Sequence, residues 1–243
     1  MPDKNHYTMH HLKTKPRISA ILFLSGILLL SGCAIKPPNE KGEFRHPDLV
    51  ELIRLDSTFR LDIRYATENN FVGRPVYPEA RAFLQQPAAE ALVKINKALR
   101  KDGYRLVIFD GYRPWSVTKL FWDVTPKENK KFVADPKTGS MHNRGCAIDL
   151  TLYEITTGKV VEMTGAYDEM SERSYPGYKG GTDEQRRMRD LLRNTMEANG
   201  FKVNDYEWWH YDYKDWKMYR VENIPFSEIM QRNLSFSPGK QNN

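Results

Sequence analysis

Cysteine is scarce in this sequence, and its scarcity limits how the fold can be stabilised. Only Cys33 and Cys146 occur among 243 residues. Cys33 lies at the end of an N-terminal leader, which leaves a single thiol for the folded part. No intramolecular disulfide is therefore expected, and the domain must depend on its core and on any metal that it binds.

A long hydrophobic run is also missing. The longest apolar run near the N-terminus, 18–30, follows four basic residues and is too short to span a bilayer comfortably. It leads into Leu30-Ser31-Gly32-Cys33, which resembles the lipobox of bacterial lipoproteins. We predict a signal peptide at 1–32 and lipidation at Cys33. The protein is then exported and lipid-anchored in the periplasm, at the outer membrane where the host has one. An ordinary secretory signal and an uncleaved anchor are the alternatives.

The chain that follows the leader has little net charge. Four of the 37 basic and one of the 31 acidic residues lie in the leader, which leaves 33 against 30, or +3. No basic stripe is present, so a nucleic-acid partner is not expected, and we infer no obligate protein partner. Three of the six histidines also lie in the leader, and the remaining ones are His46, His142 and His210.

About 210 residues remain, which is enough for one domain with a sizeable core. The polar, proline-bearing segment 33–47 is expected to be a tether, 48–234 the domain and 235–243 a disordered tail. Alternating apolar residues predict a strand at 59–65, with Tyr65 facing inward at its end, and a β-branched run predicts another at 104–110.

Three segments carry the apolar stripe of a helix. The first spans 87–101, the second begins at Pro114, and the third follows a capping box of Thr182 and Gln185 and stops at Gly200. The second helix is expected to bury Val117, Leu120, Phe121 and Val124. With a hairpin turn at 157–159 and a last strand carrying EWWHYDY, these elements predict a single α+β domain with a central antiparallel sheet flanked by helices.

Two stretches carry the residues of a candidate metal site: SMHNRGCAID, 140–149, and EWWH, 207–210. On a strand that begins at Cys146, side chains alternate, so Asp149 points away from the apolar face. Gly145 lets the chain turn so that His142 folds back toward Asp149. Considered singly, His142 is a solvated loop histidine, and Asp149 pairs with Arg144.

Together with His210, these two residues form a set of two imidazoles and one carboxylate. Three protein ligands leave one position of a zinc ion open to water, which is the arrangement of a catalytic site. Glu207 is the candidate general base for a water whose pKa the zinc lowers to roughly 7. Residues i and i+3 of a flat strand face opposite ways, so we predict a turn or bulge around Trp208.

Arg113 follows the strand 104–110 in the sequence GYRP, at a junction between a strand and a helix. A fixed guanidinium there is a candidate to stabilise the negative charge that develops on a carbonyl oxygen during amide hydrolysis. The alternative is a surface arginine paired with Asp110.

Five stretches resemble, in order, the zinc-dependent D-alanyl-D-alanine dipeptidases, including the vancomycin-resistance type. They are RYATENNFVGRPVY (64–77), FDGYRP (109–114), SMHNRGCAIDLTLY (140–153), YDEMSERS (167–174) and EWWHY (207–211). The pattern of the third and fifth stretches alone also occurs in related D,D-carboxypeptidases.

The resemblance implies a set of three zinc ligands, His142, Asp149 and His210, for one zinc ion per chain. It implies Glu207 as the general base and Arg113 as the group that stabilises the oxyanion. The expected reaction is hydrolysis of D-alanyl-D-alanine to two D-alanine, with zinc-bound water as the nucleophile.

The resemblance also implies that Tyr65, Ser140 and Asp168 bind the substrate. Asp168 suits the free ammonium of a dipeptide, because a buried charge needs an opposite partner. The segment 166–181 is long and rich in Gly and Tyr, which is typical of a lid or wall. The implied fold is the small α+β domain shared with hedgehog-type zinc domains.

Two other functions remain open. A peptidoglycan D,D-carboxypeptidase or endopeptidase would have an open groove, and a non-catalytic lipoprotein would bind wall peptides through an inactive metal site. The resistance-type enzymes act in the cytoplasm, whereas this chain carries an export leader. We therefore expect a dipeptidase that salvages D-Ala-D-Ala released by cell-wall turnover.

Overall fold

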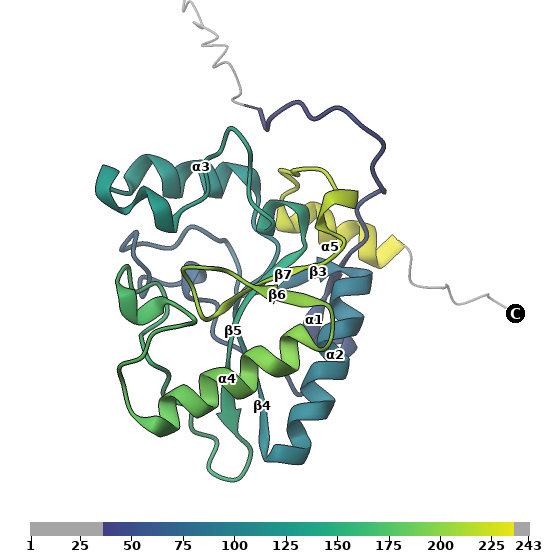
Figure 1. The fold of residues 1–243 in the computed structure, drawn as a ribbon. Helices are drawn as coiled ribbons and strands as arrows, with labels where there is room; N and C mark the ends of the chain where they lie inside the picture. The colour runs from purple at the N-terminus through teal and green to yellow at the C-terminus, as the bar shows by residue number, and fades with distance from the viewer. Residues whose placement is uncertain (1–35, 236–243) are drawn as a thin grey trace, which may run out of the picture. The chain divides into compact units, whose positions relative to one another are not determined.

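The computed structural model describes residues 36–235 of the chain (Figure 1). The predicted signal peptide, the lipidation site Cys33 and the tail from 236 onward lie outside the described residues. Within 36–235, no helix is both long and apolar enough to cross a membrane.

A five-stranded sheet forms the centre of the domain. Its strand order is β2-β4-β5-β7-β6, with β5 in the middle, and every pair is antiparallel except β2 with β4. The predicted antiparallel sheet is therefore confirmed, with one parallel pair at its edge. The bounds are β2 Arg60–Leu61, β4 Tyr104–Asp110, β5 Ala147–Glu154, β6 Phe201–Val203 and β7 His210–Tyr213; a separate antiparallel pair consists of β1 Leu49–Glu51 and β3 Phe83–Gln85.

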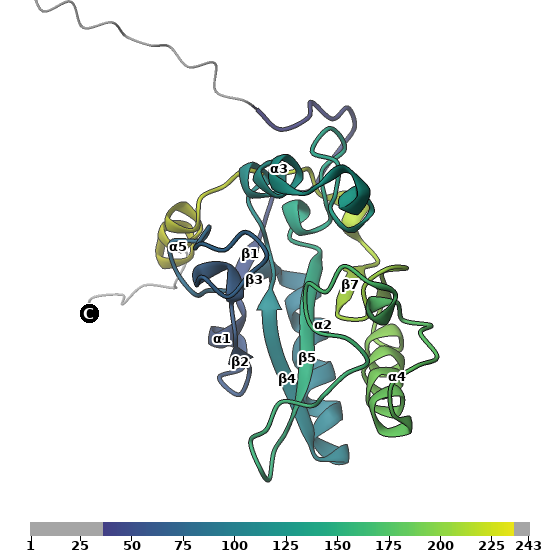
Figure 2. The ribbon, with the colours of Figure 1, turned by 90° about the vertical axis from the view of Figure 1, so that its left-hand side faces the viewer.

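Helices α2 and α4 pack against each other and cover the same side of the sheet, whereas α3 lies beyond the end of β4 (Figures 1 and 2). The α-helices are α1 Leu52–Leu55, α2 Gln86–Leu99, α3 Trp115–Val124, α4 Asp183–Glu197 and α5 Phe226–Ser235. Short 3-10 turns connect them: η1 Arg64–Ala66, η2 Arg100–Asp102, η3 Lys127–Phe132, η4 His142–Arg144, η5 Glu172–Ser174 and η6 Trp216–Met218. Three of these α-helices match the three predicted ones, and α1 and α5 were not predicted.

The start of α4 is held by the predicted capping box. The Thr182 hydroxyl oxygen accepts the Gln185 backbone N–H at 3.1 Å, and the Gln185 side-chain oxygen accepts the Thr182 backbone N–H at 2.9 Å. Two N–H groups that the helix itself leaves unpaired are thereby satisfied. One face of α4 then enters the core, where Met188, Leu192 and Met196 are buried.

The predicted inward face of α3 is partly wrong. Phe121 is buried, but Val124 at the helix end is 47% exposed. Trp115 and Thr118 are buried, and each has a hydrogen-bond partner outside the helix. The Trp115 indole N–H donates to the Pro136 carbonyl, and the Thr118 hydroxyl accepts from the Asn143 side chain, each at 2.8 Å.

The predicted strand at 59–65 ends early, at Leu61. The Asp62 N–H still bonds to the Ile108 carbonyl at 2.9 Å, and the chain then turns into η1. The Tyr65 carbonyl accepts the N–H groups of Val76 and Tyr77, which fixes this turn against the following loop. Tyr65 is nevertheless buried, as the alternation predicted.

Two loop predictions have different outcomes. The turn at 157–159 is a hairpin turn with Gly158 at a φ of +71°, but the returning chain forms only one bridge, Tyr153 to Val160. The segment 36–47 was expected to be a free tether, yet it contacts the domain: the Arg45 N–H donates to the Met218 carbonyl at 2.8 Å.

We predict that Thr182→Ala destabilises the domain by about 0.5–2 kcal/mol, because it removes one half of the capping box. Urea unfolding of the full chain measures this cost. Asn194→Ala, at an exposed position inside the same helix, is the control and is not expected to lower stability, because Ala has the higher helix propensity. Equal unfolding midpoints for the two variants would contradict the role of the cap.

Candidate active site

Strand register places three of the site residues side by side. On β5, Asp149 lies opposite His210 of β7, and on its other side it pairs with Asp110 of β4. Directly opposed residues have Cβ atoms about 4.5–5.5 Å apart. A register shift between Ile108 and Asp110 places Asp110, at the end of β4, in one row with Asp149 and His210 across the three strands.

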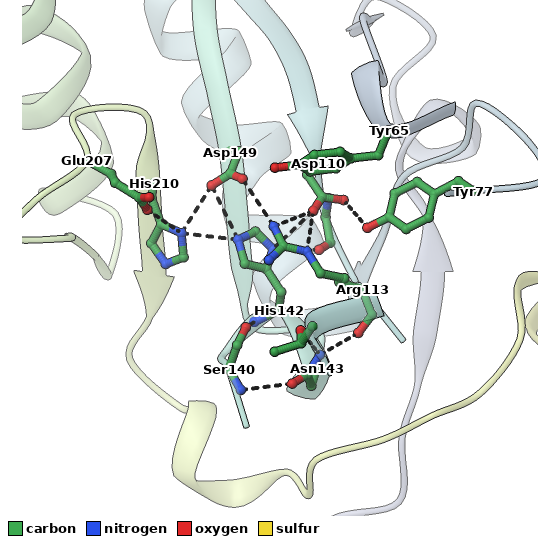
Figure 3. Close-up of polar contacts among 12 residues, drawn as sticks. Tyr65, Tyr77, Asp110, Arg113, Ser140, His142, Asn143, Asp149, Glu207 and His210 are labelled. Atoms are coloured by element: carbon green, nitrogen blue, oxygen red, sulfur yellow. Dashed lines mark hydrogen bonds and ion pairs between the residues drawn. The ribbon is translucent and has the colours of Figure 1, made fainter. Parts of the chain in front are cut away.

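His142 reaches the row from the turn η4, immediately before β5. Gly145 ends this turn with a φ of +66°, a conformation that other residues rarely adopt. A side chain at Gly145 would also collide with Leu49. The predicted turn at Gly145 is thereby present, and it returns His142 toward Asp149 (Figure 3).

The three candidate ligand atoms form a nearly equilateral triangle. The distances are 3.1 Å from His142 Nε2 to His210 Nδ1, 3.3 Å from His142 Nε2 to Asp149 Oδ1, and 3.1 Å from His210 Nδ1 to Asp149 Oδ1. Ligand atoms of a tetrahedral zinc ion lie about 3.4 Å apart, given bonds of about 2.0–2.2 Å. Asp149 Oδ1 is buried and has no hydrogen bond within the described residues. The set therefore fits a metal ion.

Each histidine is oriented by a second partner. His142 Nδ1 lies 2.7 Å from the Gly111 carbonyl, and His210 Nε2 lies 2.9 Å from Asp212 Oδ1. These partners accept the ring N–H, so the other nitrogen of each ring is left with its lone pair toward the site. Gly111 and Asp212 were not predicted as partners of the imidazoles, although Asp212 follows His210 at the i+2 spacing of one strand face.

The carboxylates of the site have opposite pKa shifts. Burial alone would raise the pKa of Asp149, but the neighbouring imidazoles of His142 and His210 bring it below the usual value. Burial raises the pKa of Glu207 to about 7. Two carboxyl groups within one site thus favour different protonation states, which is a common feature of catalytic centres.

Glu207 reaches the site because the chain turns before β7. Trp208 and Trp209 form this turn, as predicted, and both are buried. Glu207 Oε2 lies 3.6 Å from His210 Nδ1, so the two residues converge in spite of their i, i+3 spacing (Figure 3).

Arg113 is buried inside the site and does not lie on the surface. Its Nη2 is 2.7 Å from Asp110 Oδ2 and 3.6 Å from Asp149 Oδ2, and its guanidinium packs on the rings of Tyr65 and Phe121. The predicted pair with Asp110 is present, but Arg113 is not a surface residue: the pair holds it beside the candidate ligands.

The three predicted substrate-binding residues all line one cavity of about 290 Å³, together with the ligand set, Arg113 and Glu207. The Tyr65 hydroxyl donates to Asp168 at 3.0 Å, and Asp168 adopts a φ of +61°. Burial, followed by the charge of Asp149, raises the pKa of Asp168 well above its usual value. The Ser140 hydroxyl oxygen accepts the His142 N–H at 3.0 Å, so Ser140 also supports the turn η4.

The segment 166–181 forms part of the cavity wall through Asp168, Glu169 and Met170. Its Tyr167 hydroxyl donates to Asp149 Oδ2 at 3.1 Å, a contact that the sequence analysis missed. Tyr167 directly precedes Asp168, which was predicted to bind the substrate. Nothing in the local sequence pattern distinguishes Tyr167 from the other tyrosines of segment 166–181.

The cavity at the end of the sheet contains two imidazoles and a carboxylate at metal-ligand distances. A further carboxylate lies beside them. This arrangement, on an α+β fold, is that of a metallopeptidase type of site. The family profile described as D-Ala-D-Ala dipeptidase, of the M15 peptidases, matches residues 45–229. The chain belongs to this family.

Individual relatives agree with this assignment. A D-alanyl-D-alanine dipeptidase of Escherichia coli (strain K12) is 33% identical over 194 residues, which cover 80% of this chain and 96% of the relative. One of Enterococcus faecium is 37% identical over 177 residues, which cover 64% of this chain and 86% of the relative. A solved vancomycin-resistance D,D-dipeptidase, VanXYg, has a TM-score of 0.41 and 22% identity, over 81% of this chain and 63% of that chain. The family assignment depends on the sequence matches.

Proposed function

We propose that this protein is a zinc-dependent dipeptidase that hydrolyses D-alanyl-D-alanine to two D-alanine. The observation that carries the proposal is the convergence of His142, Asp149, His210 and Glu207 in one cavity of a chain that belongs to the D-Ala-D-Ala dipeptidase family.

Zinc is the metal that the donor set favours, because two imidazoles and one carboxylate are frequent ligands of catalytic zinc. A zinc ion held by His142, Asp149 and His210 would polarise the peptide carbonyl and lower the pKa of a bound water to about 7. One such ion per chain is proposed.

Glu207 and Arg113, which lie beside the ligand set, have different roles in the proposed reaction. The Glu207 carboxylate accepts the proton of the attacking water and returns it to the nitrogen of the leaving D-alanine. The Arg113 guanidinium lies beside Asp149 Oδ2, whereas the imidazoles lie beside Oδ1. It stabilises the negative charge that develops on the carbonyl oxygen of the substrate. Because Asp110 and two aromatic rings hold Arg113 in place, this stabilisation costs little reorganisation during the reaction.

Asp168 is proposed to bind the substrate's free ammonium. Its carboxylate lies in the cavity, accepts the Tyr65 hydroxyl, and has no salt bridge to a basic side chain within the described residues. An ammonium would stabilise the ionised form of Asp168, which burial disfavours, whereas an acylated amine would not. This feature favours a dipeptidase over a D,D-carboxypeptidase, whose substrate has no free amine at that position.

We predict that the purified full chain with zinc releases D-alanine from D-Ala-D-Ala much faster than from N-acetyl-D-Ala-D-Ala. The difference measures the contribution of the ammonium to binding. Preference for the acylated peptide would support the carboxypeptidase function instead. If zinc is bound and neither peptide is cleaved, the protein is a binding lipoprotein.

We predict that Glu207→Ala retains zinc and loses at least about a hundredfold in kcat, because general base catalysis typically contributes 10²–10⁴-fold. Metal content and D-alanine release are measured on the same preparation. Asp205→Ala, which removes an exposed carboxylate from the same loop, is the control and should retain activity. Full activity of the Glu207 variant would exclude this role.

We propose further that the protein is exported and held in the periplasm by a lipid on Cys33, where it salvages D-Ala-D-Ala from cell-wall turnover. The sequence Leu30-Ser31-Gly32-Cys33 after an apolar run supports this location. Cell fractionation should recover the protein with membranes, and Cys33→Ser should release it from them or block its processing. Mature protein in the cytosol would contradict the proposal.

A further inference from the structure

Arg144 is a buried arginine beside the candidate metal site, and its ionic partner comes from the N-terminal segment. It belongs to η4, two residues after His142, and is 7% exposed. Its Nη2 lies 2.5 Å from Glu40 Oε1, and this is its one salt bridge within the described residues. A buried guanidinium without a counter-charge is strongly unfavourable. Arg144 therefore depends on Glu40.

Glu40 also connects three parts of the chain: the N-terminal segment, the turn η4 and the segment 219–222. Its second oxygen, Oε2, accepts the Val221 backbone N–H at 2.7 Å, and Arg144 Nη1 donates to the Tyr219 carbonyl. The Glu222 N–H donates to the Asn143 carbonyl at 2.9 Å. The segment 219–222 thus lies against η4, and Glu40 binds both of them.

The turn η4 transmits this contact to the site. The Asn143 side chain donates to the Arg113 carbonyl at 2.8 Å, and the Arg113 N–H donates to the His142 carbonyl at 3.1 Å. His142, Asn143 and Arg144 therefore form one hydrogen-bonded unit with the segment that carries Arg113. An outward movement of Arg144 to reach water would therefore displace the turn that also carries His142.

We propose that Glu40 is a positioning residue for the metal site: it neutralises Arg144 and so holds η4, and with it His142, at metal-ligand distance from Asp149. The N-terminal segment is then part of the functional domain, although Glu40 lies upstream of the region that the family profile matches, 45–229. This inference rests on the proposed metal site and extends it to a segment that the sequence alone identified as a tether.

The test uses the full chain and compares Glu40→Gln with Glu43→Gln. Both variants remove one negative charge from the same segment, but Glu43 is exposed. Zinc affinity is measured by competition with a chromogenic chelator, and thermal stability is measured on the zinc-free chain. We expect Glu40→Gln to weaken zinc binding on the order of tenfold, as for other residues that orient metal ligands, and Glu43→Gln to leave it unchanged.

Equal zinc affinity of the two variants would overturn the proposal, even where Glu40→Gln lowers the thermal stability, because the role of Glu40 would then be structural only. A second comparison uses Arg144→Met, which removes the buried charge. In that background Glu40→Gln is expected to cause no further loss of zinc affinity, and an undiminished loss would show that Glu40 acts by another route. Because zinc competition needs no peptide, failure to cleave D-Ala-D-Ala would count against the proposed function and not against this inference.

Discussion

The pairing of β5 with β7 is the constraint on which the rest of the site depends. Its register sets Asp149 opposite His210, and the pairing with β4 adds Asp110 on the other side. A slip of one residue would turn the Asp149 side chain to the opposite face of the sheet, where Ile148 and Leu150 are fully buried. The hydrophobic packing of β5 thus fixes the position of a metal ligand.

Around this row, buried ionisable groups pack against one another. Arg113 lies between Asp110 and Asp149, and the imidazoles of His142 and His210 lie against Asp149 Oδ1. Such a network is stable only when its members are satisfied, since an unpaired charge in a low-dielectric interior is costly. A metal ion would complete the coordination of Asp149 Oδ1, and it would thereby couple binding of the ion to the stability of the end of the sheet.

The charges that line the cavity also suit its proposed substrate. Five carboxylates and only two cations line it, and one of the cations, Arg113, is already paired. A dipeptide with a free ammonium suits Asp168, and Met170 and Tyr206 form part of the cavity wall. Arg144 of η4 forms a separate ion pair with Glu40, and this pair supports His142.

The sequence by itself determined the candidate ligands, which lie in two short motifs. It also determined the turn before His210 and the capping box of α4, because each of these depends on residues close together in the chain. Strand alternation also predicted that Asp149 points away from the apolar face of its strand, and Asp149 belongs to the ligand set. Tertiary structure alone decided which partners orient the imidazoles, that Arg113 is buried, and that Tyr167 contacts Asp149. It also decided which face of α3 is buried and that residues 40–45 pack on the domain, since these contacts join segments that are distant in sequence and no local periodicity encodes them.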